Sequence, residues 1–404
     1  MQTNSDWLNL TIDDLIGRIE VGVSVQCDDR TKQDGEYGVL KTSSVGTGIF
    51  DPSEHKVALP SELSRLRVNP RYGSIVICRS NTPELVGTSA YIENDYPDLF
   101  LPDTLWQTTD HNTDAVNIRW LAHYFNGSMF RERIQNIASG TSANMKKISQ
   151  SNFMKLVIPL PPLAEQHAIA AILSTWDEAI TLTTRLIDAL KRRKQALMQL
   201  LLTGQVRFPG FEGEWEEVEI GDLLTESRTI GSTGAKARKL TVKLYGKGVI
   251  PKAETKQGSE NTAYYVRKTG QFIYSKLDFL NGAFGIIPSH LDGYETTLDL
   301  PAFDVSPLVE AAYLLNYVSR EEFYKGFLSG ARGGRKAKRI QPTEFLSASI
   351  PLPTKQEQSK MAALISLLEN YEETVNSSYE AISKQKRGLM QQLLTGAVRV
   401  DVRK

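Results

Sequence analysis

The sequence predicts an α+β protein in which two mixed α/β modules are joined by two long antiparallel coiled-coil helices, with a near-circular, pseudo-two-fold organisation. Three observations support this prediction. Residues 158–207 recur as residues 350–399, each copy carries an apolar seam of helical period, and the stretch before each copy mixes short β-type runs with helical patches. We therefore divide the 404 residues into a first module (1–157), a first spacer (158–207), a second module (208–349) and a second spacer (350–404).

The two copies of the repeat align without a gap at an offset of 192, and 20 of their 50 positions are identical. The best-matched blocks are 158–161 (Ile-Pro-Leu-Pro) with 350–353, Glu165-Gln166 with Glu357-Gln358, 197–199 with 389–391, 201–204 (Leu-Leu-Thr-Gly) with 393–396, and Val206-Arg207 with Val398-Arg399. Each module is followed by one copy of the spacer, and the modules differ from each other. This order predicts one molecule in which two different modules are held by equivalent spacers.

Each spacer is predicted to form one helix of about 40 residues, or roughly 60 Å at 1.5 Å per residue. Its apolar positions recur in alternating steps of four and three, which is typical of a coiled coil. Lys194 and Lys386 interrupt the seam at equivalent places, either to set the register or as lysines that reach solvent near a helix end. Thr354 and Glu357 have capping-box spacing, and Gly204 and Gly396 occupy the C-terminal stop. The seam positions are 169, 173, 176, 180, 183, 187, 190, 194, 197 and 201 in the first spacer and 361, 365, 368, 372, 375, 379, 382, 386, 389 and 393 in the second.

Neither spacer helix could bury its seam alone, so we expect the two to pair antiparallel about a pseudo-two-fold axis. Trp176 and Tyr379 are then expected in the coiled-coil core, together with the leucines at 197, 201, 389 and 393. Glu165 and Glu357 are expected as exposed first-turn carboxylates that complement the helix dipoles. Because joining the two chain ends would give a link as short as the one from Arg207 to the second module, the termini are expected to lie together.

The two modules resemble each other at their edges. Trp7 and Trp215 open them, and the segments 139–153 and 329–345 close them. Short β-type runs at 74–78 and 271–274 lie between turn-forming residues, and helical patches are predicted near 116–133 and 308–328. The modules are therefore predicted to be relatives whose interiors have diverged.

Composition narrows the classes of function. The 47 basic and 47 acidic residues cancel, so net charge alone indicates no polyanionic partner. No apolar run approaches the roughly 18 residues of a membrane span, and the first residues lack a signal-peptide pattern. Cys27 and Cys78 have no metal-ligand spacing, which favours a reducing cytoplasm and argues against a zinc site.

Basic residues cluster locally in the second module. Residues 236–256 hold seven Lys or Arg side chains against Glu254, and residues 332–339 hold five with no acid. Such clusters suit phosphate contacts, although solvated basic loops are also common, and charge by itself leaves both readings open.

The repeated Ile-Pro-Leu-Pro, Glu-Gln and Leu-Leu-Thr-Gly blocks resemble those of the specificity subunit of type I restriction-modification enzymes, and the resemblance covers essentially the whole chain. In the first module, residues 73–80 followed by 87–90 are similar to the strand-and-loop signature of that family. The run 140–149 resembles the loop before the conserved region. In the second module, Ser275-Lys276 with 282–285 corresponds more loosely, without a clean copy of the Arg79-Ser80 loop.

The resemblance implies that the modules are target recognition domains, each reading one half of a split, asymmetric sequence in double-stranded DNA. The paired helices would act as a ruler for the unread base pairs. They would also dock two methyltransferase subunits, with restriction subunits joining for cleavage. This chain would carry no cofactor and no metal, while S-adenosylmethionine, ATP and Mg²⁺ would bind the partner subunits.

Polar and basic side chains of predicted loops are the candidate DNA contacts, and those at 79–82 directly follow a predicted strand. Lysines, hydroxyls and backbone N–H groups can position phosphates, and Arg, Asn, Ser and Thr can pair with base edges. The alternative for each is an ordinary solvated loop or turn. The candidates are Arg79, Ser80, Asn81, Thr82, Ser142, Asn144, Lys146, Lys147, Lys243, Lys276, Arg332, Arg335, Lys336 and Lys338.

Catalytic signatures are weak, so we expect a non-catalytic subunit. Asn69-Pro70-Arg71-Tyr72 superficially resembles the Asn-Pro-Pro-Tyr site of amino-methyltransferases, but Arg71 replaces the second proline and no glycine-rich loop precedes it at the end of a strand. Two alternatives remain at this point. One is a self-contained DNA methyltransferase or nuclease, and the other is a coiled-coil scaffold that does not bind DNA.

Overall fold

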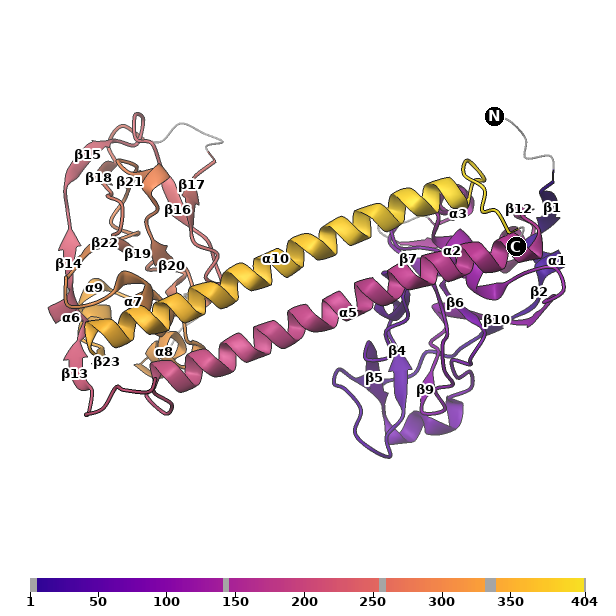
Figure 1. Ribbon diagram of the computed structural model, residues 1–404, viewed down its shortest axis with the longest axis horizontal. Helices are drawn as coiled ribbons and strands as arrows, with labels where there is room; N and C mark the ends of the chain where they lie inside the picture. The colour runs from indigo at the N-terminus through magenta and orange to yellow at the C-terminus, as the bar shows by residue number, and fades with distance from the viewer. Residues whose placement is uncertain (1–5, 141–144, 254–258, 331–338, 403–404) are drawn as a thin grey trace. The chain divides into compact units, whose positions relative to one another are not determined.

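The computed structural model describes residues 6–140, 145–253, 259–330 and 339–402. The protein divides into two compact units: unit 1 comprises residues 1–185 and 377–404, and unit 2 comprises residues 186–376. Helices α5 (Leu163–Leu202) and α10 (Lys355–Leu393) are continuous, and each contributes one half to each unit (Figure 1). Both predicted spacer helices are therefore confirmed, at 40 and 39 residues.

Unit 1 is organised around a four-stranded antiparallel sheet in the order β2-β10-β6-β8. Of its two central strands, β6 is apolar and buried at all four residues, and β10 is buried from Leu105 to Thr108, as expected for strands covered on two sides. A second four-stranded sheet, β3-β5-β4-β9, lies against the far side of this core. The strands are β2 (Ile16–Val21), β10 (Leu105–His111), β6 (Ile75–Cys78), β8 (Ser89–Tyr91), β3 (Cys27–Asp28), β5 (His55–Ala58), β4 (Gly38–Leu40) and β9 (Leu99–Phe100).

Short helices and two strand pairs complete unit 1. The helix α2 begins at Asn117, whose side chain accepts a hydrogen bond from the N–H of Trp120. Its buried face packs with α3 and with the start of α5 and the end of α10 in one core. The elements are α1 (Ile12–Leu15), α2 (Ile118–Asn126), α3 (Ser128–Ile137), α4 (Gln150–Met154), the 3-10 helices η1 (Thr42–Val45) and η2 (Pro60–Arg65), and the paired strands β1 (Leu8–Thr11) with β12 (Val157–Leu160) and β7 (Ser80–Asn81) with β11 (Lys146–Lys147).

Unit 2 contains a four-stranded antiparallel sheet in the order β14-β22-β19-β20, and Figure 1 shows these strands in that order across the unit. A three-stranded sheet and two strand pairs surround it. The strands are β14 (Leu224–Ser227), β22 (Ala302–Val305), β19 (Phe272–Tyr274), β20 (Phe284–Ile286), β15 (Ile230–Thr233), β18 (Ala263–Val266), β21 (Glu295–Thr296), β16 (Leu240–Val242) with β17 (Val249–Pro251), and β13 (Glu216–Glu219) with β23 (Ser349–Leu352).

The core of unit 2 is an aromatic cluster under short helices. Phe345 lies at its centre, with ring centroids 5.1 Å from Tyr274 and 5.5 Å from both Phe272 and Phe279. The end of α5 and the start of α10 join the same core. The helical elements are α6 (Ile220–Leu223), α7 (Ala311–Val318), α8 (Glu321–Gly326), α9 (Pro342–Leu346), η3 (Phe279–Asn281), η4 (Ser289–Leu291) and η5 (Phe327–Gly330).

The two units repeat one scaffold. The order β2-β10-β6-β8 in unit 1 matches β14-β22-β19-β20 in unit 2 along the chain and across the sheet. In both units the first strand pairs with the Ile-Pro-Leu strand that precedes the spacer helix. The prediction that the modules are relatives is confirmed at the level of topology.

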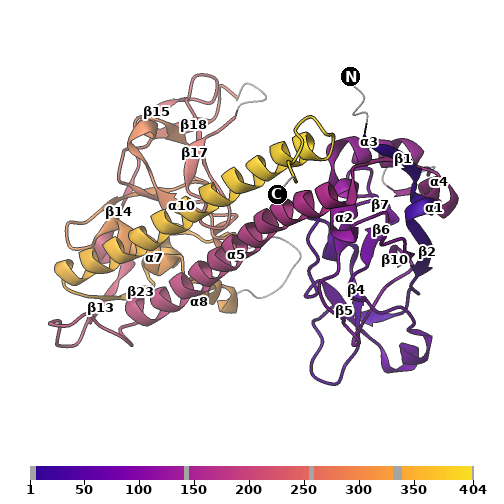
Figure 2. The same ribbon diagram turned by 45° about the vertical axis from the view of Figure 1, so that its right-hand side comes forward.

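The halves of α5 and α10 pair antiparallel within each unit, as Figure 2 shows from a second direction. In unit 1, Lys386 of α10 forms an ion pair with Asp177 of α5. In unit 2, Lys194 of α5 lies 3.0 Å from Glu372 and 3.8 Å from Glu369 of α10. The two seam lysines therefore tie one helix to the other at equivalent positions, and the left-handed Gly204 and Gly396 (φ +72° and +70°) follow the two helices.

Candidate nucleic-acid interface

Two of the predicted site segments come together in unit 1. Strand β7 (Ser80–Asn81) pairs antiparallel with β11 (Lys146–Lys147), with Asn81 opposite Lys146 and Ser80 opposite Lys147. The N–H of Ile148 donates to the carbonyl oxygen of Arg79 at 2.9 Å and extends this pairing. The expectation of a loop at the two lysines is therefore wrong: they form a short strand, because the backbone of the Arg79 segment supplies hydrogen-bond partners.

The side chains of this small ribbon differ in exposure. Lys147 is exposed, and Lys146 is half-buried with Nζ 3.3 Å from the carbonyl oxygen of Gly140. Asn81 accepts a hydrogen bond from the N–H of Thr82 through Oδ1 at 2.8 Å. Ser80 is only 3% exposed, so its side chain lies under the surface. The cationic and amide groups that reach solvent suit phosphate and base-edge contacts.

The loop after β7 is held in place by helix α3. Arg131 donates from Nη1 to the carbonyl oxygen of Val86 at 2.5 Å and from Nη2 to that of Glu84 at 2.8 Å. Burial lowers the pKa of Arg131, although a guanidinium stays charged at any ordinary pH. Gly87 (φ +79°) leaves no room for a Cβ, which would meet Ile134. Sequence reasoning missed this positioning role, because Arg131 is 45 residues away along the chain from the carbonyl it binds.

Unit 2 places Lys276 where unit 1 places Arg79. The N–H of Ile340 donates to the Lys276 carbonyl at 2.9 Å, as that of Ile148 does to Arg79. The N–H of Ser275 binds the carbonyl of Ala283 at 2.9 Å, the counterpart of the Cys78 to Thr88 bond. The two segments are only loosely similar in sequence, but their backbone hydrogen bonds correspond closely. The sequence could not show this, because backbone hydrogen bonds leave no pattern of side chains.

The remaining candidates are distributed as follows. Lys243 is exposed at the β16–β17 hairpin, where its N–H donates to the carbonyl oxygen of Gly248 at 2.9 Å. The structure does not bring Lys243 into the backbone pairing around Lys276. The candidates outside the described residues are Ser142, Asn144, Arg332, Arg335, Lys336 and Lys338.

The basic cluster at 236–256 divides into two kinds of residue. Arg238 lies over the ring of Tyr294 at 4.9 Å, and the buried Lys239 lies over Tyr264 at 5.6 Å. These cation–π contacts fix the segment before β16 against Tyr264 of β18 and against Tyr294, which precedes β21. Lys243 and Lys247 instead point their charge into solvent at the hairpin. Part of the cluster is therefore structural, which its charge alone could not show.

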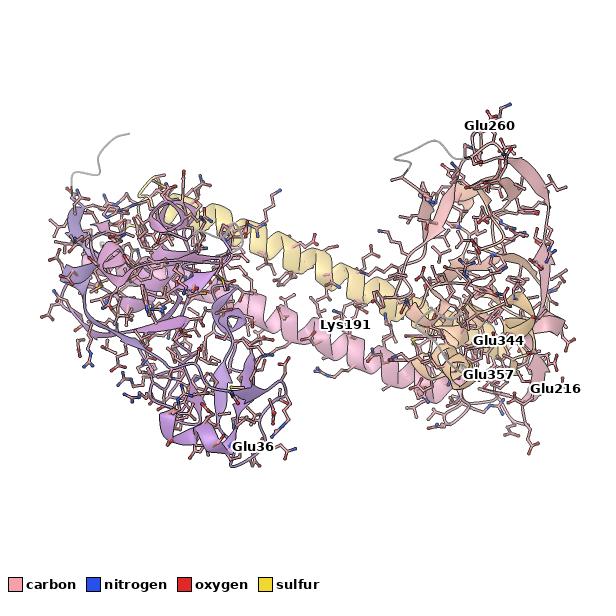
Figure 3. The ribbon with its side chains drawn as sticks, turned by 180° about the vertical axis from the view of Figure 1, so that it is seen from behind. Glu36, Lys191, Glu216, Glu260, Glu344 and Glu357 are labelled. Atoms are coloured by element: carbon pink, nitrogen blue, oxygen red, sulfur yellow. The ribbon has the colours of Figure 1, made fainter. Side chains whose placement is uncertain are left out.

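The conserved blocks of the repeat form a joint in each unit. In unit 1, Arg399 makes two 2.7 Å hydrogen bonds to the carboxylate of Glu165 and lies 5.8 Å from the Trp7 ring. In unit 2, Arg207 bonds Glu357 at 2.9 and 2.7 Å, and its guanidinium lies 5.4 Å from the ring of Trp215. Figure 3 labels Glu357 in this joint.

The joints correct one expectation and confirm another. Glu165 and Glu357 are 2% and 0% exposed, so the expectation of exposed first-turn carboxylates is wrong. Each carboxylate is bound by an arginine that follows the other spacer helix. Trp7 and Arg399, which are near the two ends of the sequence, meet at the same joint in unit 1, as the near-circular organisation predicted.

The glutamines of the repeated Glu-Gln pairs attach each module to its helix. Gln166 accepts from the N–H of Asn117 at 2.8 Å and donates to the carbonyl of Ala115 at 3.0 Å. Gln358 accepts from the N–H of Glu310 at 2.7 Å and donates to the carbonyl of Leu308 at 3.2 Å. The duplicated residues therefore serve attachment in both units.

The residues resembling a methyltransferase motif have structural roles. Asn69 donates from Nδ2 to the carbonyl oxygens of Pro97 and Leu99, at 2.9 and 2.7 Å. Among the described residues, no group of three or more His, Cys, Asp or Glu side chains could hold a metal ion. Within the same part of the chain, no helix combines the length and apolarity needed to cross a membrane.

These features define a class of protein: a duplicated scaffold in which two related α/β units, each built on an antiparallel helix pair, present different polar and basic loops. Residues 4–192 match the type I restriction modification DNA specificity domain. The chain is 25% identical to a Methanocaldococcus jannaschii protein assigned as the MjaX specificity subunit of a type I restriction enzyme, over 81% of this chain and 79% of the relative.

Solved structures agree on the fold. A crystal structure of the type I restriction-modification S subunit from M. genitalium superposes with a TM-score of 0.59 at 15% identity, covering 97% of each chain. A second structure, from work on the complex assembly and conformational transition of a type I restriction-modification system, has a TM-score of 0.56 at 15% identity. It covers 98% of this chain and 100% of the other.

The chain is thus similar to type I restriction-modification specificity subunits, through the domain match over residues 4–192 and through the MjaX relative over 81% of its length.

Proposed function

We propose that this chain reads a bipartite, asymmetric DNA sequence, with one half-site recognised by each unit, and that it does so without catalysing a reaction. The observation that carries the proposal is the contrast within the duplication. The sheet order and the Glu–Arg–Trp joint are the same in both units, while the loops after the central strands differ. A shared scaffold with different loops is suited to reading two different sequences.

The described loops have the chemistry that such reading needs. In unit 1, Arg79 and the lysines at 146 and 147 lie on one small ribbon together with Asn81 and Thr82. Lysines and arginines position a protein on phosphates, and amide and hydroxyl side chains reach base edges. In unit 2, Lys276 occupies the position equivalent to Arg79, and Lys243 lies on a neighbouring hairpin.

The proposal includes partners. Two methyltransferase subunits would dock on the spacer helices, and restriction subunits would join for cleavage. S-adenosylmethionine, ATP and Mg²⁺ would bind those subunits in the cytoplasm. In support, both helices keep exposed apolar side chains within their units, among them Leu182 on α5 and Leu367 and Tyr371 on α10. The two cysteines are also unpaired, as suits a reducing compartment.

Mapping of methylated adenines tests the proposal. Cells that carry this chain with its methyltransferase partner should methylate one split motif with two unlike halves, and deletion of the chain should abolish that motif. A motif that persists in the deletion strain, or a palindrome, would contradict the proposal.

Two further measurements address the alternatives. The purified chain, incubated alone with S-adenosylmethionine and duplex DNA, should neither methylate nor cleave it, and activity without partners would favour a self-contained enzyme. The complex with methyltransferase should shift duplex DNA in a salt-dependent way. A complex that assembles but leaves DNA unbound at low salt would favour a scaffold.

A further inference from the structure

The tip of the β16–β17 hairpin in unit 2 carries an exposed aromatic side chain beside the candidate interface. We define the hairpin tip as residues 243–248. Val242 pairs with Val249 at its base, and the N–H of Lys243 donates to Gly248 across it. Tyr245 lies in the tip and is 73% exposed.

The backbone at Tyr245 has a left-handed conformation that bulky residues rarely adopt. Its φ is +60°, and Asp110 is the one other non-glycine residue with a positive φ among the residues that the structure describes. Hydrogen bonds from the N–H groups of Tyr245 and Gly246 to the carbonyls of Asn281 and Gly282, at 2.8 and 2.9 Å, hold it there. Glycine would fit this backbone with less strain. Because the ring buries little surface, stability does not explain a tyrosine at this position.

The charge around the hairpin tip is positive. Residues 240–253 contain Lys243, Lys247 and Lys252 and no acidic residue. Lys243 and Lys247 flank Tyr245 and are exposed, and within the described ranges neither forms an ion pair. An aromatic ring between two free ammonium groups matches a surface that meets both bases and phosphates.

The hairpin tip adjoins the loop that corresponds to the Arg79 loop of unit 1. Its two clamping bonds end on Asn281 and Gly282, in the turn that leads from Lys276 to β20. At Gly282 (φ +70°) a Cβ would lie 3.3 Å from the Cα of Tyr245, so the turn and the tip fit closely. The acid in this turn, Asp278, is engaged with Ser275 and Asn281.

We propose that the hairpin tip enters a groove of the half-site that unit 2 reads, with Tyr245 against base edges and Lys243 and Lys247 on the flanking phosphates. A two-stranded ribbon fits the major groove, where a ring can contact a thymine methyl group and a hydroxyl can donate or accept a hydrogen bond. This inference rests on the proposed function and names a residue that specifies its second half-site.

Tyr245→Gly, in complex with the methyltransferase subunits, tests the inference. The variant should fold at least as stably as the wild type, because glycine relieves the strained backbone. Its affinity for the specific duplex should fall about tenfold to a hundredfold, as expected for the loss of a base-contacting aromatic group. The half of the methylation motif read by unit 2 should become degenerate, and the other half should remain unchanged. Ile230→Ala, which truncates another exposed apolar side chain of unit 2, should change neither.

Two more variants separate the roles within the tip. Tyr245→Phe should keep most of the affinity while relaxing discrimination at one base pair. Lys243→Gln with Lys247→Gln should weaken binding to all sequences and reduce the slope of log affinity against log salt by about two, one for each phosphate contact.

The outcomes distinguish this inference from the proposed function. If the wild-type complex methylates no split motif, the proposed function fails. If it does, and Tyr245→Gly leaves both halves of the motif and the affinity unchanged, the hairpin inference is overturned. Weakened assembly with the methyltransferase, at unchanged affinity of the assembled complex for DNA, would also overturn it, because the tip would then be a protein contact. Equal losses in Ile230→Ala would mean that the effect is not specific to Tyr245.

Discussion

The two units fill the same position of their common scaffold with different elements. After the central strand of each sheet the chain turns at a left-handed glycine, Gly87 in unit 1 and Gly282 in unit 2. Helix α3 packs against Gly87 through Ile134 and Arg131, whereas the β16–β17 hairpin packs against Gly282. The loop therefore leaves the scaffold at the same position in both units, but a helix supports it in unit 1 and a hairpin supports it in unit 2.

The joints show the opposite behaviour. Glu165 with Arg399 and Glu357 with Arg207 repeat the same bidentate geometry, and a tryptophan covers each pair. Two differences remain. Trp215 donates from Nε1 to Glu357 at 3.1 Å, while Trp7 Nε1 makes no hydrogen bond to the described residues. The N–H of Val400 donates to Glu165 at 3.3 Å in unit 1. The joints are therefore nearly the same in the two units, whereas the elements that support the loops differ.

The largest effect should come from the aromatic cores. Phe153 and Phe345 occupy equivalent positions, and each contacts several rings of its own unit. Truncation to alanine should cost about 3–5 kcal/mol in either unit. Hydrogen exchange should show Phe345→Ala exposing amides of β19 and β22 while β6 and β10 stay protected, and Phe153→Ala the reverse. Loss of protection in both units from one substitution would refute their independence.

Next in size is the joint. Glu357→Ala removes a buried carboxylate that accepts hydrogen bonds from both Arg207 and Trp215. Glu165 accepts a comparable third bond, from the N–H of Val400 at 3.3 Å, so Glu357→Ala and Glu165→Ala should each destabilise their own unit by a similar amount. Urea unfolding followed by tryptophan fluorescence would compare the two variants. A much larger loss in Glu357→Ala would contradict this expectation and would mean that the Trp215 bond contributes more than the Val400 bond.

A pH effect should be confined to unit 1. Burial, with Lys386 and Arg119 nearby, lowers the pKa of His123 to about 3, and Asn316 occupies the corresponding position of α7 in unit 2. In folded unit 1 His123 therefore stays neutral below pH 6.5, where the same side chain binds a proton in the unfolded chain. The free energy of unfolding of unit 1 thus falls as the pH falls. The loss should reach about 1.4 kcal/mol at pH 5.5.

Melting curves of wild type and His123→Asn at pH 7 and 5.5 measure this effect. The variant should lose less stability on acidification than the wild type. Burial raises the pKa of Asp177, which lies 3.6 Å from His123, and this works in the opposite direction closer to pH 4. For that reason the comparison stops at pH 5.5. Parallel pH dependence in the two proteins would show that His123 is not the cause.

The smallest effect is expected from moving the chain ends. The permutant joins the present termini and opens between the first spacer helix and the second module, near Gly210 and Gly213, where a Cβ would meet nothing within 4 Å. It should fold with a melting temperature within about 4 °C of the wild type, a change of about 1 kcal/mol for units of this size. Its methylation motif should be unchanged. A folded permutant that no longer binds its methyltransferase would show that the present ends are needed.

The spacer helices illustrate what local sequence can predict. The seam repeats every 3.5 residues over ten positions, and the capping residues and terminal glycines mark the ends. These features relate residues three or four positions apart, so they can be recognised from the sequence alone. The pairing lysines at 194 and 386 were visible for the same reason, but their partners were not.

The candidate interface illustrates the reverse. Arg79 and Lys147 were both singled out, yet their meeting on one ribbon depends on hydrogen bonds between backbone groups far apart in the chain. The burial of Ser80 and of Glu357 depends likewise on what packs over them. Tyr245 carried no signal at all, because exposure and a positive φ are properties of position and not of residue type.

The sequence by itself determined the duplication and the two long helices, because a repeat and a helical period are written in residue order. The tertiary structure decided which polar groups face solvent, which arginine binds which carboxylate, and which element supports each loop. The physical reason is range. The backbone hydrogen bonds and the apolar spacing of a helix relate residues within one turn, whereas strand pairing, ion pairing and burial arise from residues brought together only when the chain folds.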